Sequence, residues 1–263
     1  MKFQKLLKMK NQNNFIDIIL PNFNKAEYLQ EAIDSVVNQT FQDWKLYIID
    51  DCSTDNSHEV LNSYKQIKKI SIIKLKKNKG PSFCRNLGLR ISKSNFISFI
   101  DSDDYWEKNK LKEQIQFMEK NNFSFSFTDF IPFIQNRNEK KFLKKTNIQN
   151  TFNFNQFTLN SSINTTTMIF SRSILKNLKF KKIKKLEDYL FKCQILKQNI
   201  LAHKLNKASA FYRILNKSRS SQRFKNILYL WKINKKYNNF NLFRNLFSIF
   251  MISINSLKKY GFK

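Results

Sequence analysis

The sequence predicts an α/β protein whose central sheet is mostly parallel and flanked by helices. Between residues 15 and 110, short apolar or β-branched runs alternate with segments of helical periodicity. Repeated strand-helix alternation builds a parallel sheet with helices on both faces and right-handed crossovers. Acidic residues also follow two of the expected strands, at the sheet edge where such folds bind ligands.

The elements are expected in a regular order. A strand at residues 15–20 precedes a helix in which Leu29, Ile33, Val36 and Val37 form one apolar stripe. A strand at 44–50 precedes a helix that Ser53, Thr54 or Asp55 can cap. Strands at 70–75 and 95–101 enclose another helix, and two more strands are expected at 123–133 and 164–172.

The two acidic strand ends are Asp50 with Asp51, and Asp101 with Asp103 and Asp104. Ordinary turns and helix caps also favour Asp, so each end alone has a structural explanation. A dinucleotide-binding domain would need G-x-G-x-x-G after the first strand, but that turn, PNFNKAEY, has no glycine. Gly80 and Gly88 bracket Arg85 and can serve either a turn and helix packing or a binding site.

Composition limits the class of protein. With 263 residues, 41% of them hydrophobic, the chain can form one main domain with a small appendage. Three widely spaced cysteines and two histidines suggest neither a disulfide framework nor a zinc site, which fits a reducing cytoplasm. Residues 1–14 lack a signal-peptide pattern, and the apolar run at 246–254 is too short to span a membrane.

Three segments together resemble the motifs of family 2 glycosyltransferases of the GT-A fold, whose sheet is Rossmann-like. They are DIILPNFNKAEYLQEAIDSVVNQTFQDWKLYIIDDCSTDNS, NKGPSFCRNLGLRISKSNFISFIDSDDYW and LEDYLFKCQIL. The resemblance implies a tail at 1–14 and a catalytic domain at 15–215. Within that domain, 15–110 would bind the nucleotide-sugar and 111–215 the acceptor, and 216–263 would form a basic, amphipathic helical extension.

The resemblance also implies the site residues. The nucleotide-sugar site would comprise Pro21, Phe23, Asn24, Asp50, Asp51, Gly80, Arg85, Asp101, Ser102 and Arg213. Asp101 and Asp103 match an Asp-x-Asp motif that would bind Mn²⁺ or Mg²⁺, with Asp103 as the more direct ligand. Carboxylates suit such hard cations, which neutralise charge on a departing diphosphate.

The acid pair Glu187 and Asp188 is conspicuous because residues 172–263 contain 23 Lys or Arg and no other acid. The resemblance implies that Asp188 is the catalytic base of an inverting displacement and that Glu187 positions it or binds acceptor. The alternative is a pair that only counters a helix dipole and nearby lysines. Asp129 and residues 164–167 are candidates for acceptor contact.

Three residues depart from the family pattern. Cys52 stands where Gly is usual, which would alter the local turn. Lys192 stands where an aromatic residue is common, and this leaves the acceptor wall undefined. Leu215 stands where a histidine often follows the segment FYRILNKSRSS.

The net charge of +29 suggests a polyanionic partner or a nucleotide bias of the genome, since only eight of 48 basic residues are Arg. Nucleic-acid binding would be nonspecific, because no recognition motif is present. Residues 216–263 can form helices that lie on an anionic membrane or pack on the domain.

The expected activity is metal-dependent, inverting transfer from a nucleotide-sugar, foremost a UDP-sugar, to a glycan or lipid-linked acceptor in surface-polysaccharide synthesis. The expected location is the cytoplasm, peripherally at the inner face of the membrane. The alternative is a binding module on a degenerate glycosyltransferase fold, against which Asp51, Asp101, Asp103 and Asp188 together argue.

Overall fold

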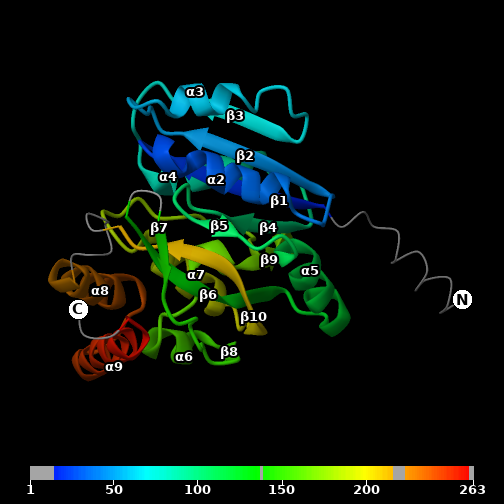
Figure 1. Cartoon of the computed structure of the whole chain (residues 1–263). Helices are drawn as coiled ribbons and strands as arrows, with labels where there is room; N and C mark the ends of the chain where they lie inside the picture. Colours follow the sequence, from blue (N-terminus) through cyan, green and yellow to red (C-terminus); the bar gives the residue numbers. More distant parts are fainter. Residues whose placement is uncertain (1–14, 137–138, 216–222, 261–263) are drawn as a thin grey trace, which may run out of the picture.

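A computed structural model describes residues 15–136, 139–215 and 223–260, and the predicted tail at 1–14 lies outside them. One sheet runs through the molecule with helices packed around it (Figure 1). Its strand order is β3-β2-β1-β4-β9-β6-β10-β5, with β7 paired to β6 and β8 to β10. The strands are β1 (Ile16–Asn22), β2 (Trp44–Asp50), β3 (Ile70–Lys74), β4 (Phe96–Phe99), β5 (Tyr105–Trp106), β6 (Phe125–Asn136), β7 (Glu139–Phe142), β8 (Thr151–Phe152), β9 (Ile169–Ser171) and β10 (Ala202–Arg213).

Helices connect and cover these strands. They are α2 (Ala26–Val37), α3 (Ser57–Asn62), α4 (Pro81–Ile91), α5 (Lys110–Asn121), α6 (Phe154–Leu159), α7 (Glu187–Leu196), α8 (Arg223–Tyr237) and α9 (Leu242–Tyr260), with short 3₁₀ helices η1 (Thr165–Thr167) and η2 (Arg172–Ile174). The mixed α/β architecture with a mostly parallel central sheet is the predicted one.

The first half of the sheet follows the predicted pattern. β1 pairs in parallel with β2 and β4, and β2 pairs in parallel with β3. The aliphatic residues of β1 (Ile16, Ile18, Ile19 and Leu20) are fully buried, because helices cover both faces of such a sheet. The predicted stripe of α2 faces the core through Leu29, Ile33 and Val36, while Val37 is only partly buried.

The second half of the sheet is mixed. β9 lies antiparallel between β4 and β6, whereas β6 and β10 are parallel. The strand predicted at 164–172 is reduced to β9, because the Asn164 side chain accepts a hydrogen bond from the Thr166 N–H (2.9 Å). This contact starts η1 and delays the strand to Ile169.

Asp55 is the residue among the predicted caps that bonds to helix ends. One carboxylate oxygen accepts from the Ser57 N–H of α3 (3.0 Å), and the other accepts from the Ala26 N–H of α2 (2.9 Å). Burial opposes ionisation, but these hydrogen bonds outweigh it and lower the pKa of Asp55. The loops after β1 and β2 are therefore held together beneath the site.

Gly80 and Gly88 have different structural roles. Gly80 precedes α4 with φ +82°, a left-handed conformation that favours glycine. At Gly88 a Cβ would lie 2.5 Å from Cγ2 of Ile19, so α4 packs directly on β1. Close packing therefore accounts for Gly88, whereas Gly80 makes the turn before α4 and also lines the cleft described below.

Helices α8 and α9 lie side by side next to α6 (Figure 1). Leu230 and Ile233 of α8 are buried, and the Tyr189 hydroxyl is hydrogen-bonded to Asn234 (2.9 Å). The extension therefore packs on the domain. Within the described ranges, no helix combines the length and apolar character needed to cross a membrane.

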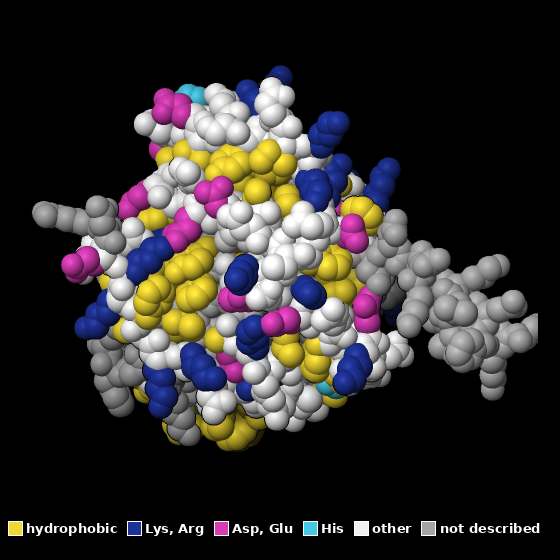
Figure 2. Space-filling model, turned by 45° about the vertical axis from the view of Figure 1, so that its right-hand side comes forward, with side chains coloured by type: hydrophobic (Ala, Val, Ile, Leu, Met, Phe, Trp, Pro, Cys, Tyr) yellow, Lys and Arg dark blue, Asp and Glu magenta, His cyan; other side chains and the backbone are white. Residues whose placement is uncertain are grey.

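Basic side chains are spread over the surface that Figure 2 shows. On this face, Lys and Arg side chains stand among acidic and apolar ones. Nucleic-acid-binding proteins instead tend to gather them into a patch or stripe. The high net charge thus gives this face no continuous basic surface.

Candidate active site

A cleft of about 1060 Å³ lies at the carboxyl ends of β1 and β4, between the starts of α4 and α7. Its volume is at the upper end of the range for small-molecule sites, and it is sufficient for a donor and part of an acceptor. Its lining includes the predicted residues Pro21, Phe23, Asp51, Gly80, Arg85, Asp101, Ser102, Asp103, Glu187, Asp188 and Arg213. The fold thus brings together residues that are distant in sequence.

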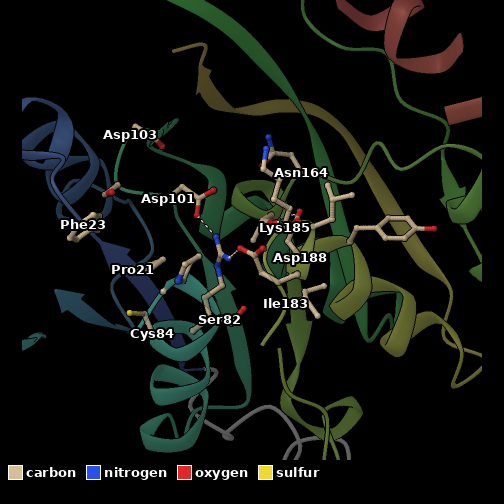
Figure 3. A pocket seen from close by; sticks show the side chains of 18 of the residues that line it. Pro21, Phe23, Ser82, Cys84, Asp101, Asp103, Asn164, Ile183, Lys185 and Asp188 are labelled. Carbon is tan, nitrogen blue, oxygen red and sulfur yellow. Dashed lines mark hydrogen bonds and ion pairs between the residues drawn. The ribbon is translucent and has the colours of Figure 1, made fainter. Parts of the chain in front are cut away.

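The cleft has two chemically distinct walls. In Figure 3, Pro21, Phe23 and Asp103 lie on one side, and Asn164, Lys185 and Asp188 lie on the other. The first wall comes from the predicted nucleotide-sugar half of the chain, and the second comes from the predicted acceptor half. The arrangement suits two substrates that meet between the walls.

Two predicted site residues, Asn24 and Asp50, do not line the cleft as the structure describes it. The Asp50 carboxylate accepts hydrogen bonds from Asn22 (2.8 Å) and from the Ser53 hydroxyl (2.6 Å). Asn24 accepts from the Thr54 N–H (2.8 Å). Both side chains hold turns together next to the cleft, and their contact with the nucleotide-sugar stays a prediction.

Asp51 shapes the cleft floor. Its two carboxylate oxygens accept from the backbone N–H groups of Lys79 and Gly80, each at 2.7 Å. The following residue, Cys52, has φ 64°, which is a left-handed backbone conformation. A glycine, which is usual at this position in the family, would adopt that conformation at a lower cost in free energy. The turn is thus preserved despite the substitution, and Asp51 fixes the loop before α4.

Arg85 joins the two halves of the site. Its guanidinium contacts Asp101 Oδ1 at 2.8 Å and Glu187 Oε1 at 3.3 Å, and the residue is buried. Burial alone would lower the pKa of Arg85, but the two carboxylates outweigh it and raise the pKa above its ordinary value. Dashed lines in Figure 3 mark these contacts. A permanently charged arginine therefore couples the Asp-x-Asp turn to the start of α7.

The Asp-x-Asp turn presents a second carboxylate, Asp103, to the cleft. Its Oδ2 forms an ion pair with Lys25 at 2.9 Å. Burial raises the pKa of Asp103 more than Lys25 lowers it, and Asp101 adds to the rise. The neighbouring Asp104 is buried, accepts hydrogen bonds from Thr166 (2.7 Å) and the Arg213 N–H (3.0 Å), and has a strongly raised pKa because of burial and the adjacent carboxylates.

This donor set fits one kind of metal site. No group of three or more His, Cys, Asp or Glu residues is placed to hold a metal within the described ranges. Mg²⁺ typically binds one or two carboxylates together with substrate phosphates rather than an all-protein cage. Asp101 and Asp103 fit a cation of that type, which would enter with the donor.

Asp188 is the accessible member of the acid pair. Its side chain is 36% exposed, against 6% for Glu187, which faces Arg85. Asp188 accepts hydrogen bonds from Lys192 Nζ (2.8 Å) and the Thr165 hydroxyl (3.2 Å). Burial would raise the pKa of Asp188, but Lys192 and then Arg85 outweigh it and hold the pKa below its ordinary value. The carboxylate that faces the cleft is therefore ionised at neutral pH.

Lys192, which departs from the family pattern, lines the cleft beside Asp188. This lysine is buried, and its ammonium also donates to the Ile163 carbonyl at 2.8 Å. Its i,i+4 spacing from Asp188 on a helix was the signal that could have indicated the pair. Lys25 carried no comparable signal, because its partner Asp103 lies far along the chain.

Two other predictions have different outcomes. Arg213 lines the cleft, but its Nε donates to the Asp103 carbonyl (2.9 Å) and its other nitrogens contact Glu31 and Gln135. Its guanidinium thus holds the Asp-x-Asp turn. Asp129, a candidate for acceptor contact, is buried in an ion pair with Lys204 (3.2 Å) and is not among the residues that line the cleft.

Comparisons with known proteins show which sequences this chain resembles. A chain of Bacillus subtilis, the putative teichuronic acid biosynthesis glycosyltransferase TuaG, is 27% identical over 95% of this chain and 99% of its own length. Escherichia coli WfaP, a UDP-Glc:alpha-D-GlcNAc-diphosphoundecaprenol beta-1,3-glucosyltransferase, is 31% identical over 94% of this chain and 96% of its own length.

Solved structures share the fold. Staphylococcus aureus TarS residues 1–349 in complex with UDP-GlcNAc has a TM-score of 0.70 at 21% identity, over 95% of this chain and 73% of TarS. The mannosyltransferase PcManGT from Pyrobaculum calidifontis, in complex with GDP-Man and Mn²⁺, has a TM-score of 0.68 at 11% identity, over 92% of this chain and 72% of that one. The family model described as glycosyl transferase family 2 matches residues 17–179, more than half the chain, and the chain belongs to that family.

Proposed function

We propose that this family 2 glycosyltransferase moves a sugar from a UDP-sugar to a lipid-linked glycan acceptor during cell-surface polysaccharide synthesis. The observation that carries the proposal is the position of Asp188, an ionised carboxylate on the cleft wall opposite the Asp-x-Asp turn. A base on the face opposite the leaving group is what a single inverting displacement needs. No covalent intermediate with the enzyme is required.

The donor would lie along the first wall. Pro21 and Phe23 border the space for the nucleoside, and Asp51 and Gly80 form the floor beside it. Ser102 and Asp103 lie where the diphosphate would meet the Asp-x-Asp turn. A Mn²⁺ or Mg²⁺ ion held there by Asp103 and Asp101 would supply charge neutralisation for the leaving diphosphate.

The chain's own groups divide the chemistry. Asp188 removes the proton from the acceptor hydroxyl while that oxygen attacks the anomeric carbon. The bond between the anomeric carbon and the diphosphate oxygen breaks, and the nucleoside diphosphate leaves with its electron pair. Lys192 keeps Asp188 ionised and oriented through their ion pair. Arg85 forms an ion pair with Glu187, so that Glu187 faces Arg85. The sugar is transferred with inversion.

The acceptor wall is basic. Lys182, Lys184 and Lys185 line the cleft immediately before Glu187. WfaP, and a second E. coli relative that is 32% identical over 83% of this chain, act on alpha-D-GlcNAc-diphosphoundecaprenol. A diphosphate linked to a lipid fits such a wall, because lysine ammonium groups bind phosphate as point charges. We place the chain at the cytoplasmic face of the membrane on this ground.

The direct test is transfer itself. The purified chain is incubated with Mn²⁺, a panel of UDP-sugars and GDP-mannose, and a short-chain GlcNAc-diphosphoprenol acceptor. Formation of a disaccharide-diphosphoprenol from a UDP-sugar, with the β configuration by NMR from an α-linked donor, is expected. Product with retained configuration would contradict the displacement at Asp188, and product only with GDP-mannose would contradict the UDP assignment.

Lys192 allows a test by pH. Substitution Lys192→Met removes the charge that lowers the pKa of Asp188, while burial still raises that pKa. Since the base must be ionised, activity falls as pH decreases through its pKa. The acid limb of the kcat profile should therefore move to higher pH in the variant. The same profile for Lys192→Met and wild type would show that Lys192 does not control the base.

The matched control is Lys197→Met. Lys197 lies at the end of the same helix but is exposed and directed away from the cleft, toward the Tyr237 carbonyl. This substitution should leave the acid limb unchanged. Thermal unfolding followed by circular dichroism confirms that both variants are folded at the pH values used.

A further inference from the structure

Helix α9 packs on the domain through polar side chains. Ser248 and Asn245 are almost completely buried. The Ser248 hydroxyl donates to the Thr158 carbonyl (2.6 Å), and Asn245 donates to the Trp231 carbonyl (3.1 Å). Asn255 donates to the Leu159 carbonyl (3.1 Å). These hydrogen bonds, together with Ile249 and Ile252, which pack against the core, hold the inward face of the helix on the domain.

The outward face of α9 is apolar. Its exposed residues and their exposed fractions are Leu242 (58%), Phe243 (81%), Leu246 (52%), Phe247 (53%) and Phe250 (59%). The spacing places all five on one stripe, which we call the α9 apolar face. A surface helix of a globular protein normally turns such a stripe inward. An exposed contiguous stripe of this kind marks an interaction surface.

The net positive charge of the C-terminal segment that carries the α9 apolar face favours an anionic partner. From residue 189 to residue 263 the sequence contains no Asp or Glu. The packed neighbour α8 contributes Lys232, Lys235 and Lys236, and α9 itself contributes Arg244. A helix with large apolar residues on one side and basic residues around it is typical of binding in the plane of a membrane interface.

The position of α8 and α9 relative to the cleft suggests a function for the α9 apolar face. Asn226 of α8 lines the cleft, and α9 packs against α8 and α6 (Figure 1). A surface beside the acceptor wall is well placed to hold the enzyme where a lipid-linked acceptor is embedded. The length and polarity of α9 suit a helix that lies on a bilayer rather than one that crosses it.

We propose that the α9 apolar face inserts into the interface of an anionic phospholipid bilayer and so docks the enzyme on the membrane. Docking would assist sugar transfer only if the acceptor is lipid-linked, as proposed above. Docking itself depends only on the α9 apolar face and the positive charge of its segment. The two can therefore fail independently.

The experiment measures vesicle binding of the full chain without donor or acceptor. Vesicles of phosphatidylcholine alone are compared with vesicles that also contain phosphatidylglycerol, by flotation at low and high salt. Wild type should float with the anionic vesicles, less so at high salt because exposed charges are screened. The triple variant Phe243→Ser, Phe247→Ser, Phe250→Ser should bind at least about tenfold more weakly, since membrane binding scales with buried apolar area.

The matched control is Phe15→Ser. Phe15 is also exposed, at 40%, and the chain enters β1 on the opposite side of the molecule from α9 in Figure 1. This variant should bind vesicles like wild type. UDP binding by calorimetry and circular dichroism should be unchanged in the triple variant, because its three phenylalanines lie outside the cleft.

Three outcomes would overturn the proposal. These are equal binding of the triple variant and wild type, no binding of wild type to anionic vesicles, and a wild-type dimer that dissociates in the triple variant by sedimentation velocity. The last would show that a second copy covers the face. If vesicle binding were lost but transfer to a short-chain acceptor were intact, the docking proposal would fail and the catalytic proposal would stand. If vesicle binding were intact but no transfer occurred, the catalytic proposal would fail and the docking proposal would stand.

Discussion

Asp188→Asn should reduce kcat about 10²- to 10⁴-fold, the range that a positioned general base contributes. The amide keeps the size of the side chain but cannot accept the proton of the acceptor hydroxyl. In the proposed arrangement the donor would lie on the opposite wall, so the dissociation constant for UDP should remain near that of wild type. Initial rates of UDP formation and calorimetric titration with UDP measure the two quantities.

Asp43→Asn is the matched control for that substitution. Asp43 is an exposed aspartate before β2 and does not line the cleft. It should have wild-type turnover. If folded Asp188→Asn also kept wild-type turnover, the base would have to be another group. The acid pair would then have only a structural role, through its ion pairs with Arg85 and Lys192.

Asp103→Asn should abolish most of the metal-dependent gain in donor binding, a weakening of about 10- to 100-fold. The reason is that the amide provides a neutral oxygen where a cation between the protein and the diphosphate requires a carboxylate. Calorimetric titration with UDP, once in Mn²⁺ and once in EDTA, separates metal-dependent binding from metal-independent binding. In EDTA the variant should bind UDP at least as well as wild type, because one negative charge near the diphosphate is gone.

Asp103 is a better test than Asp101 because its side chain has no contact with Arg85. Asp101→Asn would also disturb the bridge to Glu187, so a loss of binding could have two causes. Lys25→Met provides the complementary control, because it removes the ion-pair partner of Asp103 but leaves both carboxylates. An unchanged Mn²⁺ effect in Asp103→Asn would rule out this residue as a ligand.

The local parts of the fold were predictable from the sequence. The runs at β1 and β2 are short and apolar because both faces of a parallel sheet are buried, and the acids at the ends of β2 and β4 mark where those strands stop. The antiparallel insertion of β9 between β4 and β6 was not predictable. It depends on pairing between distant segments, and a three-residue strand carries too little periodicity to indicate its neighbours.

The site was predictable to the level of motifs but not of contacts. Adjacent residues at a strand end face different environments, so the sequence could not separate Asp50, which bonds to Ser53, from Asp51, which lines the cleft. The composition of residues 216–263 predicted an amphipathic helical segment but not which of its residues face outward. Only the hydrogen bonds of Asn245 and Ser248 on the other side of α9 show that the α9 apolar face lies outward.

The bridge made by Arg85 limits how this enzyme can be recombined with its relatives. A chimera that joined residues 15–110 of this chain to the acceptor half of another family member would separate Arg85 and Asp101 from Glu187. The buried arginine would then lack half of its countercharge unless the incoming segment supplied an acid at the same place. Donor and acceptor specificities are thus interchangeable modules only among relatives that preserve this three-residue junction.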